Sequence, residues 1–259
     1  MDEDIGIDEK RVYGAKAGRT VAVVAAEAEL VRVDVSGDLV GGFGLERRGA
    51  VASVAARDGA LAVAAEGDVL IGSDFAETGF GPASAVGFDP EGALVAAGSD
   101  RVARLGDDGW ATLSAVEDVR AIDGDLLAAA GGVFRLDGTR VGLADVRDVS
   151  TVGVPLAATA DGLYRLGNGW MDVLDGDFRV VACDGERAHA AASDALYERE
   201  RAGAEWTEVP LPVADPVAGI GYGESTYLVT GSGTFLAAGE DGWRARSLGV
   251  RDVRGLAVL

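Results

Sequence analysis

Arginines recur at one position of a short repeated motif, and a cluster of arginines can bind an anion. The motif is a polar residue, proline or alanine, then an apolar residue, two variable residues and an aliphatic residue. The polar side chains at its third position are Arg120, Arg179, Arg254, Ser84 and Ser150. Because a guanidinium binds a carboxylate or a phosphate through two hydrogen bonds, we predict that these five residues bind a ligand or a partner.

A structural interpretation of the same arginines is also open. Each could pair with a motif aspartate such as Asp118, Asp177 or Asp252. The cluster would then hold the fold together and leave no charge for a ligand.

Cys183 and His189 are the only cysteine and histidine, and they flank one turn. A catalytic cysteine needs an imidazole within hydrogen-bond reach, whereas a lone cysteine is commonly a small buried apolar residue. One histidine and one cysteine do not make a zinc site without further ligands, and the spacing of the aspartates suits turns better than calcium. We therefore predict no catalytic residue, no metal site and no cofactor.

The motif occurs seven times along the chain, with a mean spacing of about 34 residues. Its copies are AVASV (50–54), PASAV (82–86), DVRAI (118–122), DVSTV (148–152), DFRVV (177–181), PVAGI (216–220) and DVRGL (252–256). Short apolar segments separated by DG, GG, NG and SG turns follow each copy except the last. This pattern is typical of antiparallel β-meanders and predicts an all-β fold.

Seven repeats of four antiparallel strands predict a seven-bladed β-propeller. The last motif copy has no strands after it, and residues 19–35 look like second and third strands with no first strand. We therefore expect the C-terminal strand to pair with the N-terminal strands and close the ring. Residues 19–259 would form this single domain, with residues 1–18 packed on or beside it. In such a ring the third motif positions surround one mouth of the central channel.

The composition limits the possible partners. Asp and Glu number 43 against 23 Lys and Arg, a net charge of -20, which disfavours nucleic acid because phosphates must be neutralised by basic residues. A single cysteine, an acidic N-terminus and the lack of a long apolar stretch predict a cytoplasmic protein that has no contact with membranes. We expect a monomer.

With its Asp-rich, Lys-poor composition and its repeats, the chain resembles uncharacterised β-propellers of haloarchaea. That resemblance implies a halophilic protein with an acidic surface. The DGW and NGW turns resemble Asp-box repeats but lack their serine, and the GH and WD dipeptides of WD40 repeats are missing. The resemblance implies the fold and carries over no activity.

Function would then lie in the loops of a rigid ring. The sequence favours a non-enzymatic interaction scaffold that binds a protein partner or a small anion at the loop face. The alternative is an enzyme at the channel mouth that acts on an anionic or sugar-like substrate through paired carboxylates.

Overall fold

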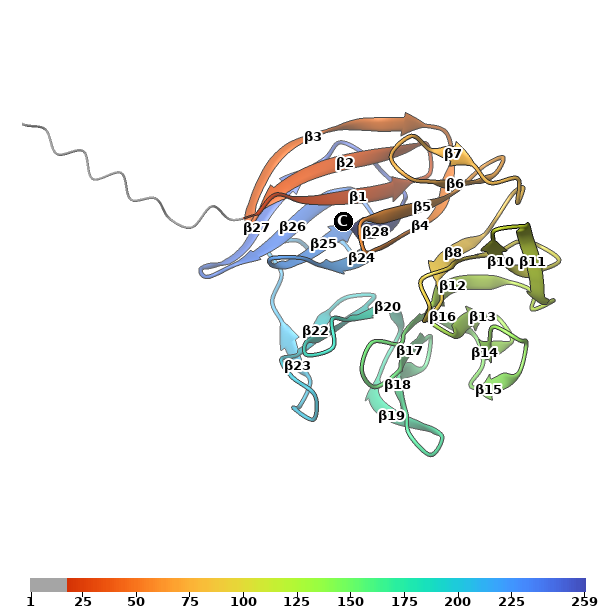
Figure 1. The fold of residues 1–259 in the computed structure, drawn as a ribbon. Coiled ribbons are helices and arrows are strands. Elements are labelled where there is room, and N and C mark those ends of the chain that lie inside the picture. The colour runs from red at the N-terminus through yellow and green to blue at the C-terminus, as the bar shows by residue number, and fades with distance from the viewer. Residues whose placement is uncertain (1–17) are drawn as a thin grey trace, which may run out of the picture.

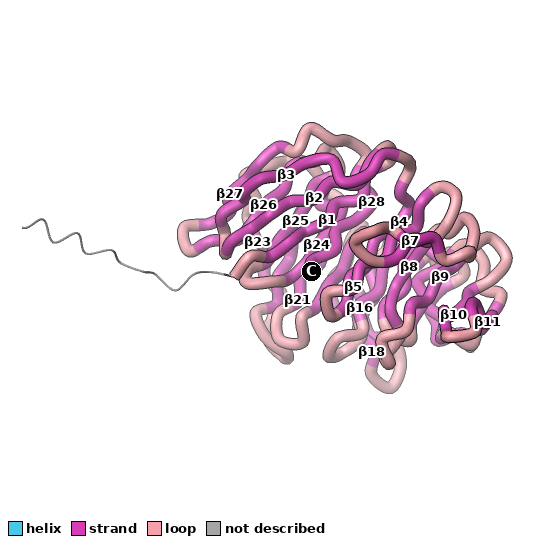
Figure 2. Tube along the Cα trace, turned by 45° about the horizontal axis from the view of Figure 1, so that its top comes forward, coloured by secondary structure: helices cyan, strands magenta, loops and turns pink. Residues whose placement is uncertain are grey.

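The computed structural model describes residues 18–259, which form 28 β-strands and no helix. The strands build seven four-stranded antiparallel sheets arranged as the blades of a ring (Figures 1 and 2). The predicted seven-bladed β-propeller is confirmed. The N-terminal segment predicted at residues 1–18 lies outside the described residues except for Gly18.

We number the blades I to VII in chain order, and each blade is given from its innermost to its outermost strand. Blade I contains β28 (Val253–Val258), β1 (Thr20–Ala26), β2 (Glu29–Ser36) and β3 (Leu39–Arg48). Blade II contains β4 (Val51–Arg57), β5 (Ala60–Ala65), β6 (Val69–Ile71) and β7 (Ala76–Glu77). Blade III contains β8 (Ala85–Phe88), β9 (Leu94–Ala97), β10 (Val102–Gly106) and β11 (Gly109–Ser114).

The remaining four blades follow the same order. Blade IV contains β12 (Val119–Asp123), β13 (Leu126–Ala129), β14 (Gly132–Arg135) and β15 (Arg140–Gly142). Blade V contains β16 (Val146–Ser150), β17 (Leu156–Thr159), β18 (Gly162–Leu166) and β19 (Trp170–Asp175). Blade VI contains β20 (Phe178–Cys183), β21 (Ala188–Ala192), β22 (Leu196–Arg199) and β23 (Thr207–Val209). Blade VII contains β24 (Val217–Tyr222), β25 (Thr226–Thr230), β26 (Thr234–Gly239) and β27 (Gly242–Ser247).

The ring closes through the C-terminal strand, as the sequence predicts. Strand β28 pairs antiparallel with β1, so that Leu256 lies opposite Val24 and Val258 lies opposite Ala22. Blade I is therefore built from both ends of the chain. Closure pairs the edge of β1 that would otherwise be exposed, which removes a site for aggregation.

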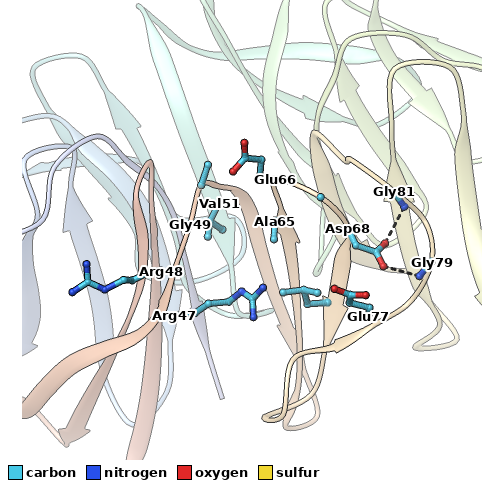
Figure 3. A pocket seen from close by; sticks show the side chains of 13 residues that line it. Arg47, Arg48, Gly49, Val51, Ala65, Glu66, Asp68, Glu77, Gly79 and Gly81 are labelled. Carbon is cyan, nitrogen blue, oxygen red and sulfur yellow. Dashed lines mark hydrogen bonds between the residues drawn. The ribbon is translucent and has the colours of Figure 1, made fainter.

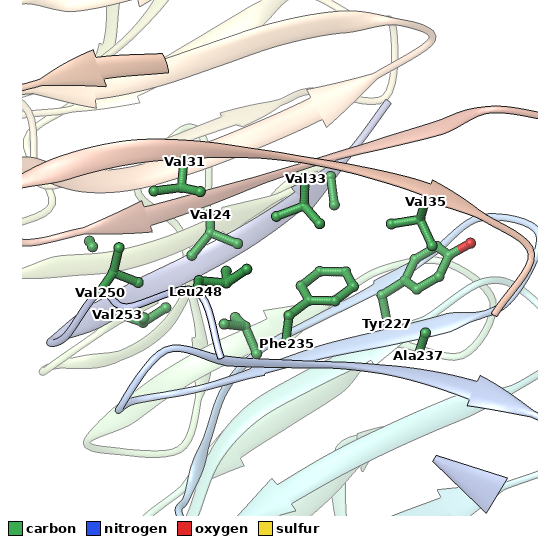
Figure 4. Close-up of a cluster of buried hydrophobic side chains, with 13 residues drawn as sticks. Val24, Val31, Val33, Val35, Tyr227, Phe235, Ala237, Leu248, Val250 and Val253 are labelled. Carbon is green, nitrogen blue, oxygen red and sulfur yellow. The ribbon is translucent and has the colours of Figure 1, made fainter. Parts of the chain in front are cut away.

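The core lies between the blades. Each of the seven clusters of buried apolar side chains combines residues from two neighbouring blades. Between blades VII and I, the rings of Tyr227 and Phe235 pack beneath Val24 and Val33 (Figure 4). Because every blade depends on two neighbours for burial, the ring is expected to unfold as one unit.

Candidate functional site

The third motif position coincides with a β-bulge at the start of the inner strand. In blade IV, Val119 pairs with Ala129 and Ala121 pairs with Ala128, so Arg120 has no residue opposite it. The same irregularity falls at Arg179 in blade VI and at Arg254 in blade I. A bulge of this kind re-aims the side chain of the extra residue.

In blade V the bulge falls at Arg147 instead of the predicted Ser150. Val146 pairs with Thr159 and Asp148 pairs with Ala158, which leaves Arg147 without a residue opposite it. The true copy of the motif is therefore DVRDV (145–149), three residues before the predicted one. Ser150 is buried, pairs with Leu156 and lies at the far end of β16, so its predicted placement at the mouth is wrong.

Four arginines thus lie at the same end of the inner strands, around the central channel. Arg120, Arg147, Arg179 and Arg254 all line an axial cavity of about 480 Å³. Ser150 also lines this cavity, but from within its strand. Ser84 is not part of the lining, and its hydroxyl donates to the carbonyl of Val119 in the next blade at 2.8 Å.

Two of the arginines are held by the neighbouring blade. The Nη1 atom of Arg120 lies 2.7 Å from Oδ1 of Asp145 and donates to the carbonyl of Val146 at 3.2 Å, both in blade V. Arg147 repeats these contacts one blade further on, with the carboxylate of Asp177 and the carbonyl of Phe178. These two arginines pair with motif aspartates, as the structural interpretation expects, but the aspartate comes from the next blade.

The other two arginines lack such a partner. Nη2 of Arg179 reaches only Asp177 of its own blade, at 3.6 Å, and its side chain is 52% exposed. Arg254 has no ion-pair partner within residues 18–259 and is exposed. The mouth therefore combines two arginines fixed by the next blade with two that are not, Arg179, which has one long contact within its own blade, and the exposed Arg254.

The comparisons with known proteins agree with this architecture. A family model described as HVO_0234-like β-propeller matches residues 6–259. The chain belongs to this β-propeller family. A search of curated proteins finds no match.

Solved structures share the fold at low sequence identity. The WD40 β-propeller domain of Doa1 is 13% identical, with a TM-score of 0.64 over 92% of this chain and 90% of that one. The computationally designed Ika8 protein is 13% identical, with a TM-score of 0.59 over 89% of this chain and 85% of that one. A chain of the nidogen/laminin complex is 11% identical, with a TM-score of 0.58 over 92% of this chain and 98% of that one. At these identities the similarity is one of fold.

Three carboxylates line the channel of the propeller, and two of them, Asp148 and Asp123, bind backbone amides of a neighbouring blade. Asp148 accepts hydrogen bonds from the backbone amides of Val149 and Val181, both at 2.9 Å, and Val181 belongs to the next blade. Asp123 accepts from the amide of Thr151 at 2.5 Å and from its hydroxyl at 3.0 Å. Each carboxylate therefore joins neighbouring inner strands.

Burial raises the pKa of Asp148 to about 7, and the charge of Asp123 adds to the increase. A carboxyl group with a higher pKa in the folded state binds its proton more tightly there, so its contribution to stability falls as the pH rises from about 4 to about 7. We predict that Asp148→Asn raises the melting temperature relative to wild type more at pH 8 than at pH 5. Melting curves at both pH values test this, with the exposed Asp172→Asn as a control for net charge. An Asp148→Asn difference that does not depend on pH would contradict the prediction.

Cys183 and His189 do not form a nucleophile and base. His189 lies opposite Ala182 and Cys183 lies opposite Ala188, so their side chains point to opposite faces of blade VI. The Nδ1 atom of His189 lies 2.9 Å from the hydroxyl oxygen of Tyr222, and burial lowers the histidine pKa to about 4. This neutral imidazole is part of the contact between blades VI and VII.

A second cavity lies between blades I and II, toward the rim (Figure 3). It measures about 760 Å³ and carries both Arg47 and Arg48 and the carboxylates of Glu66 and Glu77. Asp68, also in its wall, accepts from the amides of Gly79 and Gly81 at 2.8 and 2.9 Å. Because basic and acidic side chains line it together, this cavity favours neither an anionic nor a cationic ligand.

Within residues 18–259, no three His, Cys, Asp or Glu side chains group in a way that could hold a metal ion. The same part of the chain has no helix that is long and apolar enough to cross a membrane.

Proposed function

We propose that this propeller is a non-enzymatic interaction scaffold that binds a protein partner or a small anion at the face where its inner strands begin. The observation that supports the proposal is the pair of open arginines, Arg179 and Arg254, on the rim of the axial cavity. Exposed guanidinium groups bind carboxylates and phosphates through charge-assisted hydrogen bonds.

The local charge is notable because the chain as a whole is acidic, with a net charge of -20. At an ionic strength of 0.1 M the field of distant charges is screened beyond about 10 Å, so an anion at the mouth interacts mainly with the arginines around it. Arg120 and Arg147 are already fixed by the next blade, which gives the mouth a rigid frame.

The channel carboxylates favour binding over acid–base catalysis. Asp123 and Asp148 both accept backbone hydrogen bonds from a neighbouring blade. A general acid or base must instead reach the proton that it transfers. We therefore place the activity of the propeller in recognition.

The proposal is tested by an affinity pull-down from a native lysate with wild type and Arg179→Ala/Arg254→Ala. The matched control is Arg165→Ala/Arg201→Ala, which removes two exposed arginines away from the mouth. We expect a partner that wild type and control retain and the mouth variant loses. Melting temperatures in phosphate and in chloride at equal ionic strength test the small anion, because a ligand of the folded state raises the melting temperature.

Two negative results together would contradict the proposal. These are a lysate with no arginine-dependent partner and melting temperatures that phosphate does not raise.

A further inference from the structure

We propose that the group bound at the mouth is a carboxylate on an acidic segment of a partner protein, which takes the place of an aspartate that two blades lack. This inference rests on the proposed function and specifies its ligand. The template is internal, because blades V and VI show how a motif aspartate binds the arginine of the preceding blade.

The position of that aspartate can be identified in other blades by a backbone hydrogen bond. The residue just before the inner strand accepts, through its carbonyl, the amide of a residue that follows the second strand. Asp177 accepts in this way from Ser193 at 3.0 Å. The other residues with the same hydrogen bond are Asp118, Asp252, Ala50 and Pro216. Ala50 and Pro216 therefore occupy the aspartate position of blades II and VII.

These two replacements explain which arginines are open. The inner strands contact one another in the order β20, β24, β28, β4, so blade VII follows Arg179 and blade II follows Arg254. In the next blade, Pro216 precedes the inner strand beside the strand of Arg179, and Ala50 precedes the inner strand beside that of Arg254. Neither residue offers a carboxylate. Each arginine lacks the partner that Asp145 provides for Arg120.

The blade between the two open positions argues against a compact anion. Blade I lies between blades VII and II and carries Asp252 at its aspartate position. In the preceding blade VII, the position of the arginine is occupied by Ala218, which offers Asp252 no charge. Asp252 has no ion-pair partner in the part of the chain that the structure describes. A small anion that bridged Arg179 and Arg254 would meet this carboxylate. An extended segment with separated acidic side chains can reach both arginines and pass Asp252 with a neutral or basic residue.

The test places an aspartate of the protein itself at each of the two positions that lack one, residues 50 and 216. The variant Ala50→Asp/Pro216→Asp gives Arg179 and Arg254 internal carboxylates and leaves the arginines in place. Its matched control, Ala50→Asn/Pro216→Asn, has the same shape without the charge. Asp118, Asp145 and Asp252 have positive φ at this position, whereas Asp177 binds Arg147 without it. Ala50 and Pro216 also lack positive φ, so Asp177 is the template for aspartate at these two positions.

Binding is measured by fluorescence anisotropy with a fluorescein-labelled peptide of six aspartates, and the corresponding asparagine peptide serves as the uncharged probe. We expect the Asp variant to bind the acidic peptide about tenfold or more weakly, as for the loss of hydrogen bonds to charged groups, and the Asn variant to bind like wild type. Inorganic phosphate should compete poorly. Melting curves of each variant verify the fold. If replacing Pro216 lowers stability, Ala50→Asp alone tests the position next to Arg254.

The outcomes separate this inference from the proposed function. Loss of peptide binding in Arg179→Ala/Arg254→Ala with unchanged binding in the Asp variant would overturn the inference and leave an arginine-dependent scaffold. Competition by phosphate at concentrations similar to those of the peptide would overturn it as well. Absence of peptide binding to every form of the protein would overturn the inference, and the pull-down would then decide on the proposed function.

Discussion

Deletion of residues 252–259 is expected to leave a protein that has no cooperative melting transition at the temperature of the full chain and that aggregates. These residues include β28, the innermost strand of blade I, which pairs with β1 from Ala22 to Ala26. Val253 and Ala257 are buried in the two clusters that flank this blade. Burial of an aliphatic side chain contributes about 1.5–3 kcal/mol, and the deletion also exposes the edge of β1 to other chains.

Circular dichroism melting and size-exclusion chromatography measure this effect. Arg254→Ala is the control, because it keeps the strand and removes only an exposed side chain without an ion pair. Its melting temperature should stay close to that of wild type. A shortened chain that melts like the full protein would show that blade I is stable without its inner strand.

The number of blades and the closure of the ring could be predicted because they follow from repetition. The motif occurs once per inner strand, with an apolar and an aliphatic residue such as Val119 and Ile122 on either side of its variable positions. A bulge accompanies it in every inner strand except β8. Asp-Gly turns mark the hairpins between strands, since glycine adopts positive φ there, as at Gly59 and Gly124. The N-terminal strands lack an inner strand and the C-terminal strand lacks the other strands of a blade, so pairing of the two completes blade I.

The register of one motif copy could not be settled locally. Residues 145–152 contain two overlapping matches, DVRDV and DVSTV, and both place an aliphatic residue three positions after the first valine. Only the pairing of β16 with β17 shows that the bulge is at Arg147. The signal in the sequence was the Asp-Val-Arg triplet that this copy shares with the copies at Arg120 and Arg254.

The partners of the mouth residues also lay beyond the sequence. Spacing alone suggests that Arg120 pairs with Asp118 of its own motif, but the bulge directs the guanidinium to Asp145 of the following blade. Ser84 precedes β8 and lies at no bulge, but its hydroxyl also donates to the next blade, at the carbonyl of Val119. The direction in which a bulged side chain points depends on the strand that receives it, and the neighbouring strand is about 30 residues away in sequence.

Replacement of Gly87 by alanine is expected to destabilise the propeller strongly, because its backbone touches the next blade. Gly87 lies in β8, and a Cβ atom added there would be 2.4 Å from the carbonyl oxygen of Ile122 and 2.8 Å from its Cβ. The carbonyl belongs to the inner strand of blade IV and cannot rotate away as a side chain could. Overpacking of this kind costs about 1–3 kcal/mol, and contact with backbone places Gly87→Ala at the upper end of that range.

Gly42→Ala in β3 is the matched control, because no heavy atom lies within 4 Å of a Cβ added there. Its melting temperature should equal that of wild type, whereas that of Gly87→Ala should fall by several degrees. Equal melting temperatures for the two variants would mean that the inner strands of blades III and IV can separate without cost. The comparison therefore tests the close approach of the inner strands, on which the spacing of the four mouth arginines depends.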